Sequence, residues 1–163
     1  MKKSQFKYYT NILKEGEYLL LKSKDSYFKS HYKGSLLNDF TNFSGTAGEA
    51  VLSKNGKIKI FVDTRYHILV EKQVYKNIEI VKVPLNETFF DAFKKEFPKK
   101  AVFYLPYDID LSEYMKYDSY FDLRTYKPCE EHIKNESLNL LFLFQEYYLK
   151  KAHVFLLRSP KIK

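Results

Sequence analysis

The stretch NFSGTAGEAVLSKNGKIKIFVDTRYHILVEKQV, residues 42–74, decides the fold predicted for this chain. Two glycines three residues apart precede two apolar runs, and Asn55-Gly56 lies between those runs. An Asn-Gly pair favours a tight type I′ turn, because both central residues of that turn need a positive φ. We therefore predict a β-hairpin around this pair. The apolar spacing that follows, from Thr64 to Val74, predicts a helix.

The two glycines, Gly45 and Gly48, do not fit a nucleotide-binding loop. A dinucleotide-binding fold places G-x-G-x-x-G between a strand and a helix, whereas these glycines follow a helical turn and precede a strand. A P-loop would need Lys directly after the second glycine, and Glu49 stands there. We predict instead that these glycines, with the small Ala47, let the backbone turn tightly and pack beneath a neighbouring element.

Helix and strand patterns alternate along the rest of the chain. Before the glycines, the predicted elements are a helix at Ser4–Lys14, a strand at 17–23, a helix at 25–32 capped by Asp25, and a helical turn at 35–40. After Val74 they are a strand at 77–83, a helix at 86–97 capped by Asn86, a strand at 100–106, a helix at 110–117 capped by Asp110, and a strand at 120–124. This alternation predicts an α/β fold with helices flanking a sheet, and the hairpin makes that sheet mixed.

The composition indicates one globular domain and restricts its partners. The chain has 163 residues, of which 45% are hydrophobic and 29% charged, and both values are ordinary for a folded protein. The net charge is +8, but nearly all of the basic residues are lysines, and the arginines are Arg65, Arg124 and Arg158. Because arginine forks dominate specific recognition of bases and phosphates, the sequence argues against a nucleic-acid partner.

The sequence also predicts a cytoplasmic location. The single cysteine, Cys129, cannot form an internal disulfide, which fits a reducing compartment. No apolar leader segment follows the first residues. The longest apolar run, residues 138–157, is interrupted by polar and charged residues, so no membrane span is predicted. This apolar tail either docks on the core of its own domain or covers a neighbour that is missing from the chain.

The sequence contains no self-contained catalytic or metal-binding pattern. The four histidines are scattered, and the Cys-Glu-Glu-His run at 129–132 lies in a polar connector without suitable spacing. Asp63 can cap a helix, which places Arg65 and Tyr66 in its first turn, near the carboxyl end of a strand, where functional side chains are common. The alternative is that Arg65 only forms an ion pair, with Asp39 or Asp63.

Four short segments occur in a characteristic order. They are Ser30-His31-Tyr32, Thr41 to Gly48 (TNFSGTAG), Asp63-Thr64-Arg65-Tyr66 and Glu71-Lys72-Gln73. In order and spacing they resemble the S-E-Y, T-G-F-x-G-S-A-G, D-G-R-Y and E-K-Q segments of the creatinase/prolidase/Xaa-Pro aminopeptidase superfamily, in the amino-terminal domain of its aminopeptidase P branch. His31 replaces Glu, and Asn42 and Thr64 each replace Gly. The likeness covers residues 25–75 and extends to about residue 125 through the order of strands and helices.

This resemblance implies a fold and a division of the chain. The fold is the mixed α/β fold of a creatinase amino-terminal domain, with a ribonuclease H-like motif, over residues 1–135. Residues 136–163 are then a helix or linker that leads to a catalytic domain outside this chain, or that packs on the same domain. In the family, the catalytic domain holds two divalent metals, usually Mn, and removes the amino-terminal residue that precedes proline.

The resemblance also implies that the domain itself is not catalytic. In the family it shapes the mouth of the active site, often that of a neighbouring subunit, and helps to form the oligomer. The implied partners are the chain's own catalytic domain, a second subunit and a proline-containing peptide. The candidate surface residues are Arg65, Tyr66 and Phe43, and the residues of the structural motif are Gly45, Ala47, Gly48 and Asp63. The alternative is a stand-alone binding module without peptidase activity, like the similar domain at the amino terminus of a histone-chaperone subunit.

Overall fold

The computed structural model describes residues 3–23, 35–106 and 109–126. The chain divides into two units, Met1–Lys127 and Pro128–Lys163, and every described residue lies in the first. The predicted helix at 25–32, the predicted domain boundary at residue 135 and the apolar tail lie outside the described residues. The division into domains therefore stays a prediction.

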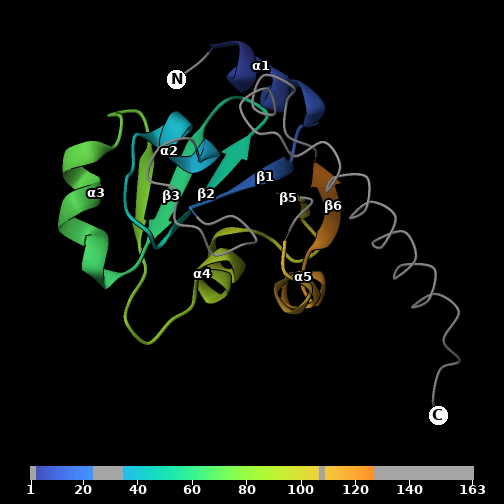
Figure 1. Ribbon diagram of the computed structural model, residues 1–163. Helices are drawn as coiled ribbons and strands as arrows, with labels where there is room; N and C mark the ends of the chain where they lie inside the picture. Colours follow the sequence, from blue (N-terminus) through green and yellow to red (C-terminus); the bar gives the residue numbers. More distant parts are fainter. Residues whose placement is uncertain (1–2, 24–34, 107–108, 127–163) are drawn as a thin grey trace, which may run out of the picture. The chain divides into compact units, whose positions relative to one another are not determined.

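Within the described residues, six strands form one sheet in the order β4-β3-β2-β1-β5-β6 (Figure 1). The strands are β1 (Glu17–Lys22), β2 (Gly48–Ser53), β3 (Ile58–Val62), β4 (Glu79–Lys82), β5 (Val102–Pro106) and β6 (Asp122–Tyr126). The helices are α1 (Lys3–Ile12), α2 (Leu36–Thr41), α3 (His67–Gln73), α4 (Phe89–Glu96) and α5 (Leu111–Asp118), with a short 3₁₀ helix, η1 (Thr64–Tyr66), before α3. Neighbouring strands are parallel except where β2 pairs antiparallel with β1 and β3, so the predicted mixed sheet is confirmed.

The helices cover both faces of the sheet (Figure 1). On one face, α4 and α5 contribute side chains to a buried cluster that includes Leu20 of β1. On the other face, the ring of Tyr9 on α1 contacts those of Phe40 on α2 and Tyr126 on β6, at centroid distances of 5.8 and 5.5 Å. Because both faces of the sheet are covered, the central strand β1 is an almost continuous apolar run rather than an alternating one.

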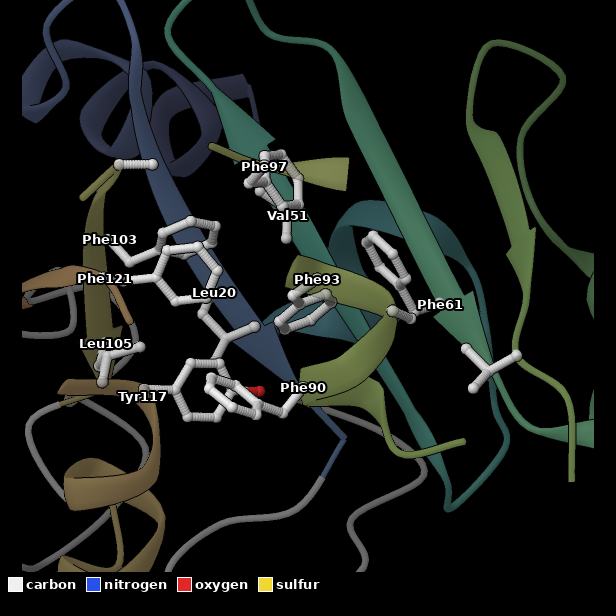
Figure 2. Close-up of a cluster of buried hydrophobic side chains, with 13 residues drawn as sticks. Leu20, Val51, Phe61, Phe90, Phe93, Phe97, Phe103, Leu105, Tyr117 and Phe121 are labelled. Atoms are coloured by element: carbon white, nitrogen blue, oxygen red, sulfur yellow. The ribbon is translucent and has the colours of Figure 1, made fainter. Parts of the chain in front are cut away.

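Aromatic rings fill the cluster beneath α4 and α5 (Figure 2). The ring of Phe93 packs edge-on against that of Phe61, with centroids 4.4 Å apart, and the rings of Phe103 and Phe121 lie 4.6 Å apart. All four side chains are buried. Such aromatic pairs each add about 0.5–1.5 kcal/mol beyond the burial of their area. The cluster therefore holds the two helices firmly against the sheet.

The hairpin between β2 and β3 forms as predicted, but its turn is not type I′. Gly56 has a positive φ of 79°, whereas Asn55, which a type I′ turn also requires to have a positive φ, does not. The Gly56 N–H donates to the Ser53 carbonyl, and the Asn55 side chain accepts from the Ser53 hydroxyl and the Lys57 N–H. A type I turn followed by one left-handed glycine results, because the asparagine side chain satisfies the loop in that conformation.

Helix caps follow the sequence at two of three described positions. Asp63 and Asp110 accept hydrogen bonds from N–H groups in the turns that follow them, as predicted. The cap predicted at Asn86 is wrong, since Thr88 caps α4 instead. Thr88 and Asp91, three residues apart, exchange hydrogen bonds in a capping box, which satisfies two backbone donors at once. That reciprocal pair outweighs the intrinsic preference of asparagine for a cap.

The topology brings two predicted segments to one edge of the sheet. β1, β3 and β5 are parallel, so their carboxyl ends share an edge, and the antiparallel β2 begins there. The loop that enters β2 therefore lies beside the segment that leaves β3 at Asp63. Ligands of open α/β sheets bind at this edge, which makes it the place where functional side chains are expected.

Candidate functional site

The turn between α2 and β2 begins at Asn42. This residue ends α2 with a φ of 64°, in the left-handed conformation, and its N–H donates to the Asn38 carbonyl. The Asn38 side chain in turn donates to the Phe43 carbonyl at 3.0 Å. Asparagine tolerates left-handed backbone better than most residues. It can therefore stand where the resembling sequences have glycine.

Residues 44–48, which we call the glycine loop, wrap around the ring of Phe43. That side chain is 1% exposed. A Cβ atom added at Gly45 would lie 2.2 Å from Cζ of the ring, and one at Gly48 would lie 2.7 Å from Cε1. Neither glycine has a positive φ, so the close approach of the ring, and not the backbone conformation, requires them. Ala47 is half-buried. Phe43 thus supports the loop from inside and offers no surface of its own.

Tyr66 of η1 holds the glycine loop from a second side. Its ring packs edge-on against that of Phe43, with centroids 5.5 Å apart and planes at 83°. Its hydroxyl accepts from the Thr46 N–H at 3.3 Å and lies 2.7 Å from the Thr46 hydroxyl. Tyr66 is half-buried, so part of the ring remains at the surface. The structure therefore brings together the glycine loop, Phe43 and Tyr66, which only the family resemblance linked in the sequence.

Arg65 lies exposed beside this assembly. Its Nη2 lies 2.5 Å from Oδ2 of Asp63, and its Nε lies 3.1 Å from the same oxygen. The guanidinium carbon is 5.6 Å from the centre of the Tyr66 ring, yet the side chain is 69% exposed. The alternative of an ion pair with Asp63 is therefore observed. Carboxylate and ring together fix the direction of a guanidinium that still faces solvent, and its role toward a partner stays a prediction.

Gln73 at the end of α3 was not among the predicted site residues, although it lies in the Glu-Lys-Gln segment. Its Oε1 accepts from the Ser44 N–H at 3.0 Å, and its Nε2 donates to the Ser44 hydroxyl at 2.8 Å. Its carbonyl accepts from the Asn42 side chain at 2.8 Å. Gln73 thus fastens both the start of the glycine loop and the turn before it. The sequence segment signalled this position, but only the fold shows its contacts.

A second group at the same edge of the sheet was missed entirely. Lys22, Glu49, Glu113 and Tyr117, which we call the Lys22 cluster, come from β1, β2 and α5. The ammonium group of Lys22 lies 3.7 Å from Glu49 Oε1 and also pairs with Glu113. The Tyr117 hydroxyl donates to Glu49 Oε2 at 2.9 Å. Glu49, the residue that excluded a P-loop, is therefore a buried acid with two partners.

Burial governs the proton affinities in this cluster. Desolvation raises the pKa of the Glu49 carboxyl above its ordinary value, and the nearby ammonium of Lys22 acts in the opposite direction. Burial, together with the Glu49 carboxylate, raises the pKa of the Tyr117 phenol well above its ordinary value. The phenol therefore stays protonated and remains a donor to the carboxylate. This arrangement anchors α5 to the centre of the sheet.

Neither group of residues forms a metal site. In residues 3–23, 35–106 and 109–126, no three His, Cys, Asp or Glu side chains lie close enough together to hold a metal ion. The predicted Cys-Glu-Glu-His connector lies outside this part of the chain. No helix in the same part of the chain has the length and apolar character needed to cross a bilayer. The described residues of the site can thus contact and orient a partner molecule, but they do not include a set of ligands for a metal ion.

Several solved structures share this fold. A Creatine_N superfamily domain of a dipeptidase from Streptococcus thermophilus matches with a TM-score of 0.57 at 11% identity, over 81% of this chain and 98% of that chain. An Xaa-Pro dipeptidase from Bacillus anthracis matches with a TM-score of 0.56 at 19% identity, over 76% of this chain and 33% of that chain. An X-prolyl aminopeptidase from Caenorhabditis elegans, a cytosolic enzyme with a di-nuclear active site, matches with a TM-score of 0.56 at 13% identity, over 76% and 21%.

These matches confirm the predicted likeness to creatinase/prolidase amino-terminal domains at the level of the fold. No family model matches the sequence, and no curated protein sequence matches it. The match spans about a third or less of the two whole enzymes but nearly all of the isolated domain. The likeness is therefore to a part of these enzymes that is about the length of one domain.

Proposed function

We propose that this chain is the non-catalytic amino-terminal domain of an Xaa-Pro peptidase-like metalloenzyme. The observation that supports this proposal is the match over 98% of an isolated creatinase-type domain, against 33% and 21% of two whole enzymes. The domain would shape the mouth of the active site and contribute to the contact between subunits. Hydrolysis of the bond before proline would take place in a separate catalytic domain that binds two divalent metals, with Mn expected. The proposed location is the cytoplasm.

The second candidate is a stand-alone binding module of the same fold. The observation that favours it is that Asp63 and the Tyr66 ring orient an exposed Arg65 guanidinium beside the tightly packed glycine loop. On this alternative, the edge that carries Arg65 and Tyr66 would bind a partner directly. The two candidates differ in whether a catalytic domain is joined to the chain.

The native mass of the polypeptide tests the first candidate. An antibody against this domain is expected to detect, in lysate of the source cells, a band much heavier than the 19.5 kDa of this chain. The purified native protein is expected to cleave Xaa-Pro peptides when Mn²⁺ is supplied, and to lose that activity when the metal is chelated. Peptides with alanine in place of proline are the control. A native band at 19.5 kDa would exclude the peptidase and leave the binding module.

Replacement of Arg65 tests the surface role within that enzyme. Arg65→Gln is expected to lower kcat/KM for Xaa-Pro peptides by about tenfold, or to shift the oligomeric state, because one charge-assisted contact to substrate or subunit is lost. The urea midpoint is expected to stay unchanged, since the side chain is largely exposed. Lys76→Gln, which removes another exposed positive charge beyond α3, is the control. If kinetics and assembly both match the parent enzyme, Arg65 has no role beyond its pair with Asp63.

A further inference from the structure

The positive charge of the described residues gathers at one end of the sheet. These residues include seventeen lysines and arginines and fourteen aspartates and glutamates, a net charge of +3. Residues 3–16 and 53–58, which form α1, the turn after it and the β2–β3 hairpin, contain five lysines and one acid. This segment alone carries +4, so all other described residues together carry −1. If the excess of lysine were spread evenly along the chain, the two parts would not differ in this way in their net charge.

The five lysines lie on neighbouring elements that pack together. We call these elements the α1–hairpin surface, and its lysines are Lys3, Lys7, Lys14, Lys54 and Lys57. An added Cβ at Gly56 of the hairpin would lie 3.2 Å from the ring of Phe6 on α1, so the two elements pack together. The Lys54 ammonium donates to the Thr10 carbonyl of α1 at 3.0 Å, which binds the hairpin to the end of the helix. Figure 1 shows both elements at the same end of the sheet.

Most of this charge is free to attract a partner. Lys3, Lys7, Lys14 and Lys57 are exposed, and no ion pair joins any of the four to another described residue. α1 itself contains no acidic residue. This contrasts with the opposite helices, where for example Lys94 and Lys95 pair with carboxylates. Lys54 is bonded to Thr10 and Lys14 lies near the Glu17 carboxylate, so Lys3, Lys7 and Lys57 are the lysines of the α1–hairpin surface whose charge has no described electrostatic partner within the domain.

We propose that the α1–hairpin surface binds the phosphate backbone of nucleic acid without regard to base sequence. Duplex DNA carries about one negative charge per 1.7 Å, and lysines gain affinity for it by releasing condensed counterions. The scarcity of arginine argues against reading of bases, but this attraction needs only ammonium groups.

The alternatives of a membrane or an acidic protein fit less well. A helix that lies on a membrane inserts apolar side chains between the lipids. The apolar residues of α1 instead face the core, where Tyr9 is fully buried, and its exposed side offers only the partly exposed ring of Tyr8. An acidic polypeptide has a lower charge density than a duplex, so it would bind lysines with less gain from counterion release.

The dependence of binding on salt tests this proposal. A labelled 20-base-pair duplex of arbitrary sequence is titrated with the full 163-residue chain, and binding is followed by fluorescence anisotropy. The slope of log K against log[KCl] is expected to be about −4.5, because each of the five lysines neutralises one phosphate and each neutralised phosphate contributes about −0.9. The variant Lys3→Gln/Lys7→Gln/Lys57→Gln is expected to reduce the slope to about −2 and to weaken binding at low salt by at least about tenfold. Its urea midpoint is expected to be unchanged because the three side chains are exposed.

A matched control variant distinguishes binding by the α1–hairpin surface from attraction by the net charge of the whole chain. Lys72→Gln/Lys76→Gln/Lys116→Gln removes the same charge from exposed positions on other elements, and it is expected to keep the parent slope within about one unit. Equal losses in the two variants would overturn the proposal, because only net charge would then matter. Binding to vesicles of 30% phosphatidylserine that exceeds binding to the duplex, or equal competition by polyglutamate, would also overturn it in favour of a lipid or protein partner. An unrelated duplex sequence is expected to bind equally well.

Discussion

Replacing Phe43 by alanine is expected to lower the free energy of unfolding by about 3–5 kcal/mol, the usual cost of removing a buried phenylalanine. The ring is almost completely enclosed by the glycine loop and the edge of Tyr66, so its removal leaves a cavity that these elements can fill only in part. Equilibrium unfolding in urea measures the loss. Phe43→Leu, which keeps most of the volume, is expected to cost less.

Urea unfolding of glycine variants tests whether the ring of Phe43 is the reason that Gly45 is a glycine. Gly45→Ala is expected to cost about 1–3 kcal/mol, because the new methyl group would collide with the ring of Phe43. In the Phe43→Ala background that cost is expected to fall, leaving the smaller conflict with Tyr66. Gly16→Ala is the control: its φ is 77° with open space around it, so its cost comes from the backbone and is independent of Phe43. Additive costs for Gly45 and Phe43 would show that the ring does not dictate the loop.

Replacing Lys22 by methionine is expected to cost about 3 kcal/mol at about pH 7, because it leaves Glu49 buried without a counterion. The loss is expected to shrink as the pH is lowered to about 5. The reason is the direction of the pKa shift: burial raises the pKa of Glu49, so the folded state binds a proton at a higher pH than the unfolded state does. Between the two pKa values acidification therefore favours the folded state, and a neutral carboxyl no longer needs the ammonium group.

Lys59→Met is the matched control for this measurement. Lys59 also pairs with two carboxylates, but those of Glu79 and Glu96 are 65% and 33% exposed, so water can replace the ammonium group. Its loss is expected to be smaller than that of Lys22→Met and to change little between the two pH values. The double variant Lys22→Met/Glu49→Gln is expected to recover part of the stability, since the buried charge is gone. A loss at Lys22 that does not depend on pH would show that Glu49 does not titrate there.

Local patterns predicted most of the fold. The alternation of apolar runs predicted the order of strands and helices. The N-caps at Asp63 and Asp110 were predictable because a capping side chain bonds to N–H groups no more than three residues away. The neighbours of the glycine loop in sequence predicted that it follows a helical turn and precedes a strand, and it does lie between α2 and β2. The sequence could not show the second contact of the loop, since the approach of Tyr66 to Gly45 depends on the meeting of two separate loops.

Long-range polar contacts escaped prediction for the same physical reason. Tyr117 and Glu49 are 68 residues apart, and nothing local to either indicates the hydrogen bond between them. Glu49 lies in a strand whose other residues are mostly apolar, where an isolated acid is equally compatible with the surface. Gln73 is 29 residues from Ser44, and its segment was noticed only through the family resemblance. The predictions at Asn55 and Asn86 were wrong because specific side-chain hydrogen bonds decided the local structure. The Asn55 side chain accepts from the Lys57 N–H in the hairpin, and Thr88 and Asp91 form the capping box of α4.

The position of β1 in the sheet has a consequence for how the chain folds. The strands from β1 to β4 are neighbours in both sheet and sequence, so each pair forms across a connection much shorter than the one that separates β1 from β5. β5 joins by pairing with β1, where Glu17 lies opposite Val102, 85 positions later in the chain. Closing that long loop costs more entropy than any hairpin step. The half from β1 to β4 can therefore serve as the nucleus, and the pairing of β5 and β6 then completes the sheet and closes the aromatic core.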